Sequence, residues 1–176
     1  MTSEDGAEAG ALVSLTESEL RAWGAVLGRS AQADGVFVAL YGELGSGKST
    51  LVRAACRALG VMGHVPSPTF TLVNLHEGEE GPIHHVDLYR LEPPVDSRTL
   101  IDAGWPEVLE ADGPVFVEWA DRAEDWLPAD RWDVRLRRAA DPSLREASAE
   151  ARGAAPPAPP PSGVGAPDGA VSRDRC

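Results

Sequence analysis

The segment from Gly42 to Ser49 reads Gly-Glu-Leu-Gly-Ser-Gly-Lys-Ser and carries the clearest chemical pattern in the sequence. It matches G-x-x-x-x-G-K-[ST] at every fixed position. Glycines let backbone N–H groups approach phosphate oxygens, and the dipole of a following helix favours the same anion. Lys48 can reach the β- and γ-phosphates, and the Ser49 hydroxyl can coordinate Mg²⁺. We therefore expect a nucleoside triphosphate site made by Gly42, Glu43, Leu44, Gly45, Ser46, Gly47, Lys48, Ser49 and Thr50.

Lys48 is also the only lysine in the chain, and all other basic residues are arginines. A guanine-binding N-K-x-D loop would need a second lysine, so the sequence favours ATP over GTP. The broad planar fork of an arginine would suit a tight phosphate loop poorly. A purely structural glycine-rich turn is the alternative, but the pattern follows a predicted strand and opens a predicted helix, which is the context that a phosphate loop requires.

Two carboxylates stand at the ends of apolar stretches, Asp87 after Ile-His-His-Val and Glu118 after Val-Phe-Val. Hydrolysis of a triphosphate needs an acidic group near Mg²⁺ and a group that positions water. The carboxyl ends of parallel strands gather beside the phosphate site in α/β sheets. We therefore expect both Asp87 and Glu118 to be functional residues of the phosphate site. The alternative for each is an exposed acid at a strand end.

Other polar and aromatic residues carry weaker signals. The loop from Pro66 to Phe70 could turn hydroxyls toward the γ-phosphate, or it could be an ordinary proline-rich turn. Trp119 directly follows Glu118, at a place where a tryptophan is more often a core residue. Cys56 is expected to pack as a small apolar residue. Three histidines have no second ligand at metal-binding spacing and are interpreted as core or surface residues: His64, His76 and His84.

The elements that must position these residues alternate between strand and helix. Thr16 to Glu19 form a capping box ahead of a helix that Gly28 can end. The order predicts an α/β fold, a P-loop NTPase-like three-layer sandwich with a mainly parallel central sheet and additional antiparallel strands. Strands are expected at 36–41, 70–75, 83–88, 115–119 and 133–136, a helix at 49–59, and a helical stretch at 99–109 broken at Gly104 and Pro106.

The composition divides the chain into three parts. Residues 1–10 are expected to be disordered, residues 11–138 to form the P-loop ATPase domain, and residues 139–176 to be a disordered tail. The last 38 residues include 10 Ala, 7 Pro and 4 Gly without an aromatic residue, so they bury too little apolar surface to offset the entropy of ordering. The proline-rich segment 156–161 is interpreted as solvated, with a polyproline ligand as the alternative.

The formal net charge of -12 disfavours a protein that grips the nucleic-acid backbone directly. The acidic residues are densest from Glu107 to Asp133. No apolar run approaches the ~20 residues that cross a bilayer. The first ten residues carry acids and no basic residue, unlike a signal peptide. With only two cysteines, a disulfide scaffold is disfavoured and the cytoplasm is the expected location.

Four motifs together resemble the bacterial ATPase family TsaE, also called YjeE. They are the phosphate loop at 42–49, Ser-Pro-Thr-Phe-Thr-Leu-Val at 67–73, His-Val-Asp-Leu-Tyr-Arg at 85–90, and Glu118-Trp119. The resemblance covers residues 12–138. It departs from the family at Ser49, where many members carry threonine, and at Thr99-Leu100, where many carry Glu-Leu.

The resemblance implies a slow, Mg²⁺-dependent ATP hydrolase that works with the TsaD–TsaB pair. That family supports threonylcarbamoyladenosine modification beside the anticodon of tRNAs that read ANN codons, and tRNA would be met only through the complex. By motif, Thr69 is the threonine that senses the γ-phosphate and metal. Asp87 is the metal-site carboxylate, Glu118 supports Mg²⁺ or the attacking water, and Trp119 shapes the nucleotide pocket and partner surface.

Two other functions stay open at this level. A small P-loop metabolite kinase is the main alternative, but its arginine-bearing lid would have only Arg90 and Arg98 to draw on. A nucleotide-regulated binding module without meaningful hydrolysis is the other, and Glu118 argues against it.

Overall fold

A computed structural model of the chain describes residues 11–68 and 71–162. Within them one seven-stranded sheet has the order β1-β7-β6-β2-β5-β4-β3. The strands are β1 (Val13–Thr16), β2 (Phe37–Tyr41), β3 (Val73–Gly78), β4 (Gly81–Asp87), β5 (Val115–Glu118), β6 (Arg131–Arg138) and β7 (Leu144–Arg152). The helices are α1 (Glu17–Asp34), α2 (Lys48–Ala58), α3 (Ser97–Asp102), α4 (Trp105–Leu109) and the 3₁₀ helix η1 (Ala120–Trp126).

The centre of the sheet is parallel. Strand β2 pairs in parallel with β5 and β6, and β4 pairs in parallel with β5. Antiparallel pairs extend both sides, β3 with β4 at one edge and β6 with β7 and β7 with β1 at the other. All five residues of β2 are buried, as expected for a strand covered on both faces.

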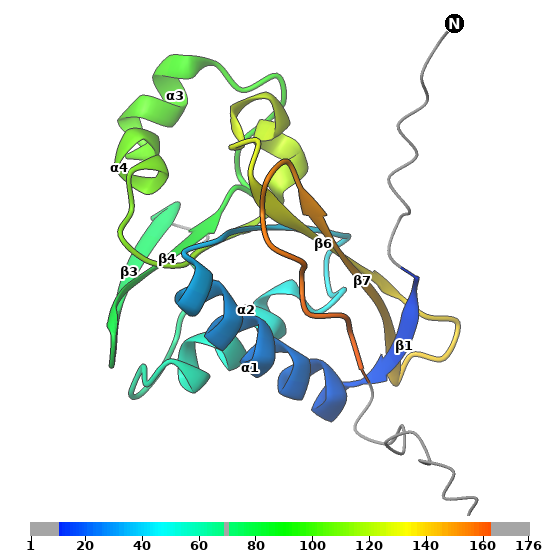
Figure 1. Cartoon of the computed structure of the whole chain (residues 1–176). Coiled ribbons are helices and arrows are strands. Elements are labelled where there is room, and N and C mark those ends of the chain that lie inside the picture. The colour runs from blue at the N-terminus through cyan, green and yellow to red at the C-terminus, as the bar shows by residue number, and fades with distance from the viewer. Residues whose placement is uncertain (1–10, 69–70, 163–176) are drawn as a thin grey trace, which may run out of the picture.

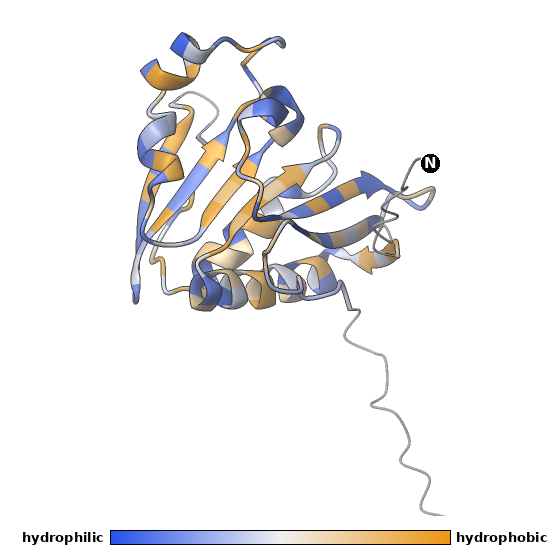
Figure 2. Ribbon diagram, turned by 45° about the horizontal axis from the view of Figure 1, so that its top comes forward, coloured by the Kyte–Doolittle hydropathy of each residue, from blue (hydrophilic) through white to orange (hydrophobic). Residues whose placement is uncertain are grey.

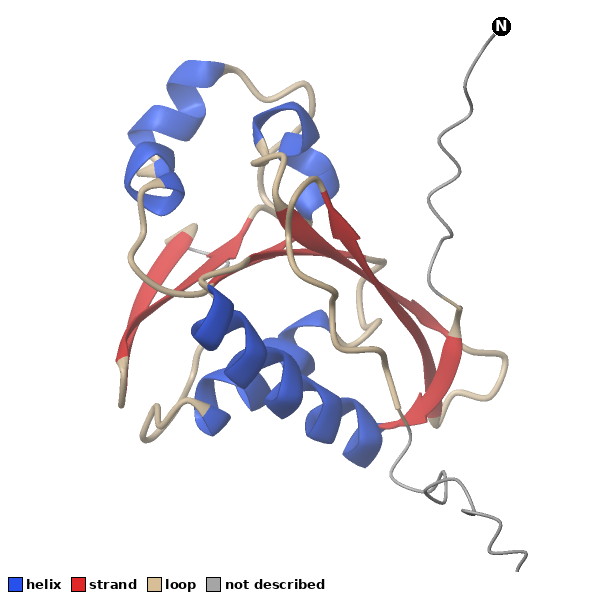
Figure 3. Ribbon diagram, viewed as in Figure 1, coloured by secondary structure: helices blue, strands red, loops and turns tan. Residues whose placement is uncertain are grey.

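Helices cover both faces of the sheet, which confirms the predicted three-layer α/β sandwich. Helices α1 and α2 lie on one face, and α3, α4 and η1 lie on the other (Figure 1; Figure 3). Each layer has its own apolar cluster. Trp23, Leu51 and Phe116 belong to the first, and Val86, Trp105 and Val117 belong to the second. No helix in the described part of the chain has the length and apolar character that crossing a membrane requires.

Helix α1 begins as predicted but does not end where predicted. Thr16 accepts a hydrogen bond from the Glu19 backbone and completes the capping box. The helix continues past Gly28 to Asp34 and ends at Gly35, which adopts a left-handed conformation with φ 62°. Gly28 is instead a packing residue, because a Cβ atom there would lie 2.9 Å from the Cα and Cβ of Ala55 on α2. The predicted stop at Gly28 is therefore wrong.

The predicted helical stretch divides at Gly104, as expected, while Pro106 lies in the first turn of α4 and does not break it. The first strand after α2 begins at Val73, three residues later than predicted. Strand β1 was not predicted.

The prediction of a disordered tail from residue 139 is wrong for residues 144–162. Strand β7 pairs with both β6 and β1. Ala147 is fully buried, and Ala149 and Ala151 pack against the same cluster, so alternate alanines of β7 face the α1 side of the sheet. Figure 2 shows the resulting alternation of polar and apolar residues along β6 and β7. The ordered domain therefore extends well beyond residue 138.

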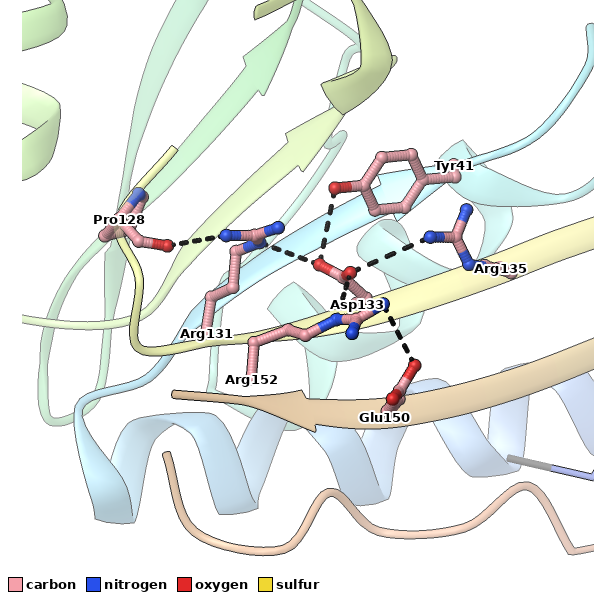
Figure 4. Close-up of polar contacts among 7 residues, drawn as sticks. All are labelled: Tyr41, Pro128, Arg131, Asp133, Arg135, Glu150 and Arg152. Carbon is pink, nitrogen blue, oxygen red and sulfur yellow. Dashed lines mark hydrogen bonds and ion pairs between the residues drawn. The ribbon is translucent and has the colours of Figure 1, made fainter. Parts of the chain in front are cut away.

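Asp133 connects β7 to the rest of the sheet (Figure 4). This buried carboxylate accepts hydrogen bonds from Arg131 Nε at 2.8 Å and, on β7, from Arg152 Nε at 2.9 Å. The Tyr41 hydroxyl on β2 donates to it at 3.3 Å. Burial, reinforced by the negative charge of Asp133, raises the pKa of Tyr41 to about 12. Because a buried charge needs such partners, Asp133 joins three neighbouring strands.

Residues 153–162 return along α1 (Figure 1). The indole nitrogens of two buried tryptophans donate to backbone carbonyls of this segment, Trp132 to Pro156 at 2.7 Å and Trp23 to Pro159 at 3.0 Å. Pro161 is buried. The proline-rich segment is thus part of the folded domain, not a solvated tail. The predictions for residues 1–10 and 163–176 lie outside the described residues.

Candidate nucleotide and metal site

A cavity of about 460 Å³ opens where β4 and β5 end and α2 begins. It collects most of the residues that the sequence singles out. Its lining comprises Glu17, Leu20, Leu44, Gly45, Gly47, Lys48, Ser49, Thr50, Ser67, Asp87, Tyr89, Glu118, Trp119, Pro142, Ser143 and Arg145.

The phosphate loop connects β2 to α2, and glycines make its path possible. Gly42, Gly45 and Gly47 all have positive φ, a conformation that residues with a Cβ rarely adopt. At Gly42 a Cβ atom would also lie 2.1 Å from the Leu136 carbonyl oxygen. Gly47 is the N-cap of α2, so the start of an eleven-residue helix faces the cavity. Backbone N–H groups at such a terminus attract a phosphate.

Lys48 is almost fully buried, with 4% of its surface exposed. Its Nζ donates to the carbonyl oxygens of Gly42 at 2.5 Å and Glu43 at 3.0 Å, and it lies 3.9 Å from the centre of the Trp119 ring. Burial lowers the pKa of Lys48, while Glu118 and Asp87 act against that shift. The loop thus holds its only lysine folded back on its own carbonyls, within the cavity.

Glu118 lies at the end of β5 and is joined to two other elements. Ser49 Oγ on α2 donates to Glu118 Oε2 at 2.7 Å. His85 Nε2 on β4 lies 2.8 Å from Glu118 Oε1. Both Glu118 and His85 are buried. The structure therefore brings together Ser49 and Glu118, two residues predicted to share a metal.

Asp87 is the register partner of Glu118 on the neighbouring parallel strand. Its Oδ1 accepts from the Tyr89 backbone N–H at 3.0 Å, and its Oδ2 accepts from Ser67 Oγ at 2.9 Å. Ser67 belongs to the loop whose hydroxyls were expected to face the γ-phosphate. Thr69, the residue of that loop chosen as catalytic, lies outside the described residues.

The available oxygen atoms suit Mg²⁺ better than a softer metal. Ser49, Asp87 and Glu118 offer a hydroxyl and two carboxylates, the hard donors that this ion takes together with water and phosphate oxygens. Among residues 11–68 and 71–162, no group of three or more His, Cys, Asp or Glu side chains forms an all-protein metal site. A magnesium that arrives with a nucleotide needs no such group, so the residues fit the ion.

Trp119 is partly buried: it packs against the second apolar cluster and also lines the cavity. Its ring lines the cavity and lies 5.0 Å from the ring of Tyr89. Its backbone has φ 58°, a left-handed conformation that is uncommon for a bulky residue. It is the N-cap of η1, so the 3₁₀ helix begins at the edge of the site.

Sequence reasoning missed the support that the β6–β7 hairpin gives to the phosphate loop. Arg138 Nη2 donates to the Leu44 carbonyl at 2.7 Å, and Arg145 Nε donates to the Gly45 carbonyl at 3.1 Å. The Arg138 backbone N–H also donates to Glu43 Oε1. The signal that could have revealed the hairpin is the two-residue alternation of alanine with polar residues from 146 to 151.

Comparison with known proteins agrees with this geometry. A sequence model of the family described as "Threonylcarbamoyl adenosine biosynthesis protein TsaE" matches residues 14–147. The crystal structure of Bacillus subtilis YdiB superposes with a TM-score of 0.62 at 26% identity and covers 81% of this chain and 86% of that one. The chain therefore has the P-loop NTPase-like fold that the sequence predicts.

Three curated relatives carry the name "tRNA threonylcarbamoyladenosine biosynthesis protein TsaE". The Streptomyces coelicolor protein is 40% identical over 107 residues, which span 60% of this chain and 70% of that protein. The Treponema pallidum protein is 33% identical over 129 residues, which span 73% of this chain and 92% of that protein. The Bacillus subtilis protein is 35% identical over 107 residues; the match spans 61% of this chain and 65% of that protein, just under two thirds of its length. The chain belongs to the TsaE family of threonylcarbamoyladenosine biosynthesis proteins.

Proposed function

We propose that the protein is a Mg²⁺-dependent ATPase that assists the threonylcarbamoyladenosine modification of tRNA. The observation that carries the proposal is the contact of 2.7 Å between Ser49 and Glu118 beside the buried Lys48. It unites a phosphate-binding lysine, a metal-binding hydroxyl and a carboxylate in one cavity. Those are the parts that hydrolysis of a triphosphate requires.

Each residue has a distinct task in this proposal. The N–H groups of the phosphate loop and the Lys48 ammonium bind the phosphates. Ser49 and Asp87, with Glu118, would hold Mg²⁺, which when bound neutralises charge on the phosphate oxygens. Glu118 orients the attacking water, and Thr69 contacts the γ-phosphate. Trp119 covers Lys48 from the side where η1 begins.

Membership of the family supports a place in the tRNA modification pathway. We propose that the chain acts in the cytoplasm with the TsaD–TsaB pair, that its ATP cycle supports repeated turnover on ANN-decoding tRNAs, and that TsaD performs the transfer itself. The net charge of -12 supports contact with tRNA through the protein partners. The family match disfavours the alternative of a metabolite kinase.

A pull-down with TsaD and TsaB, with and without ATP, tests the partnership. We expect the full chain to retain both proteins, and the retained amount to change with ATP. A Lys48→Ala variant is the matched control, because it should lose the ATP dependence. Absence of association in both conditions would contradict the proposed partnership.

A further inference from the structure

His85 is a fully buried histidine beside the site. It lies on β4 two residues before Asp87, and alternate residues of a strand share a face. The side chains of His85 and Asp87 therefore point to the face that Ile83 shares with α2. The neighbouring parallel strand β5 places Glu118 on that face too, so strand register brings His85 and Glu118 together across 33 residues of sequence.

The contact between His85 and Glu118 has a definite direction. An ionised carboxylate only accepts hydrogen bonds, so His85 Nε2 must carry the hydrogen and donate to Glu118 Oε1 at 2.8 Å. The other ring nitrogen, Nδ1, is buried and has no hydrogen-bond partner within the described residues. The contact requires only an N–H at Nε2, which both the neutral ring and the imidazolium can supply.

The two oxygens of Glu118 thus make hydrogen bonds to two different elements, β4 and α2. Oε1 is held by His85 from the sheet, and Oε2 accepts from Ser49 at the start of α2. The contact of His85 therefore does not depend on the contact of Ser49, because each engages a different oxygen of the carboxylate. With His85 fully buried and Glu118 only 2% exposed, water cannot easily replace the imidazole as the donor to Oε1.

We propose that His85 is a positioning residue that fixes the carboxylate of Glu118 in the orientation needed for ATP hydrolysis. This inference rests on the proposed ATPase function. His85 lines no part of the cavity, so it acts through Glu118 and touches neither ATP nor the metal. Loss of a hydrogen-bonded partner of this kind costs on the order of 10- to 100-fold in activity.

The test compares His85→Leu with His85→Gln in the full chain with TsaD and TsaB present. Leucine fills similar volume without a donor, and we expect kcat for ATP hydrolysis to fall about 10- to 100-fold with KM and the ATP dissociation constant within about twofold. Glutamine extends an N–H to nearly the same point as Nε2, so it should restore most of kcat. His84→Leu, one residue earlier and on the opposite face, is the control and should leave kcat unchanged.

Three results would overturn the inference. The first is wild-type kcat in His85→Leu. The second is a parallel loss of kcat and ATP affinity that His85→Gln does not rescue, which would show a purely structural role. The third is a wild-type protein that binds its partners but does not hydrolyse ATP, which would also refute the proposed function; the first two leave that function intact. If His85→Leu does not fold, His85→Asn replaces it, since its amide is too short to reach Glu118.

Discussion

Trp119 has two structural roles at this site, one through its backbone and one through its ring. Its left-handed backbone turns the chain from β5 into η1, and its ring contacts both the Lys48 ammonium and the ring of Tyr89. A tryptophan accepts such a conformation only where the surroundings stabilise it. The contact with the Lys48 ammonium supplies part of that stabilisation, because an aromatic face attracts a cation.

Replacing Trp119 with alanine should therefore weaken ATP binding. A cation–π contact of this kind is worth about 1 kcal/mol, so we expect the dissociation constant for Mg·ATP, measured by calorimetry, to rise roughly fivefold. Trp119→Phe keeps an aromatic face and should bind nearly as tightly as the wild type. Equal affinity in the alanine variant would show that the ring does not order the lysine.

Residues of the site differ in how far the sequence could predict them. The phosphate loop is a local pattern of eight residues, so every member from Gly42 to Ser49 could be named in advance. Asp87 and Glu118 could be named because each ends an apolar strand. The role of His85 could not, because its partner is set by which strands become neighbours, and that depends on the assembled sheet.

At the scale of elements, α1 and α2 pack at unusually close range. Gly24 and Gly28 are one helical turn apart on α1, and each faces α2 directly. A Cβ at Gly24 would lie 2.7 Å from the Leu51 carbonyl oxygen, and one at Gly28 would lie 2.9 Å from Ala55. These glycines fix the position of α2, whose first turn carries Lys48 and Ser49.

A Gly28→Ala substitution has two opposing effects on the free energy of unfolding, one from helix propensity and one from packing. Alanine favours an isolated helix over glycine by about 1 kcal/mol, but overpacking typically costs about 1–3 kcal/mol. Because the obstructing atoms include backbone, we expect packing to dominate and the free energy of unfolding in urea to fall by up to about 2 kcal/mol. Val26→Ala, at an exposed position of the same helix, is the control. A stabilised Gly28→Ala protein would contradict the close packing.

The segment 153–162 should contribute to stability through its two tryptophan contacts. A chain ending at Gly153 loses the carbonyl acceptors of Trp23 and Trp132, and a buried donor without a partner costs about 1–3 kcal/mol. We expect its free energy of unfolding to be at least about 2 kcal/mol below that of a chain ending at Ser162, which keeps both acceptors. Equal stability of the two truncated chains would show that the contacts contribute nothing.

Composition was a good guide to the central strands and a poor one to β7. Alanine has a low preference for strands, so an alanine-rich stretch with prolines beyond it resembles a disordered tail. The structure uses those small residues because β7 packs beside α1, where Ala147 and Ala149 join the core. The buried carboxylate of Asp133, which appears in the sequence as one more acid, supplies the charge that Arg152 of β7 needs.

At the scale of the whole molecule, acidic residues gather beside the candidate nucleotide site. Helix η1, whose N-cap is Trp119, exposes Asp121, Glu124 and Asp125, and these residues line a groove with Pro93 and Pro94. A basic surface of a partner could bind this acidic surface. Because Trp119 contacts Lys48 and is the N-cap of the same helix, such binding would couple partner docking to the position of Trp119.

A double reversal, Glu124→Lys with Asp125→Lys, should therefore weaken association with TsaD–TsaB while ATP affinity stays unchanged, because like charges would then face the basic partner surface. The control is Glu77→Lys with Glu80→Lys, which changes net charge equally on the β3–β4 hairpin, where both residues are also exposed. Pull-down titrations at two salt concentrations measure the association of each double variant with TsaD–TsaB. If both reversals weaken association equally, net charge and not this surface is responsible.

The central claim is that the site hydrolyses ATP through Glu118 in support of the modification complex. Steady-state ATP hydrolysis with TsaD and TsaB tests it most directly, for the wild type, Glu118→Gln and the exposed control Glu110→Gln. We expect the partners to stimulate hydrolysis by the wild type and the Glu110 variant alike. We also expect Glu118→Gln to bind ATP but to turn it over at least about 100-fold more slowly. Hydrolysis by Glu118→Gln at the wild-type rate would contradict the proposed role of Glu118.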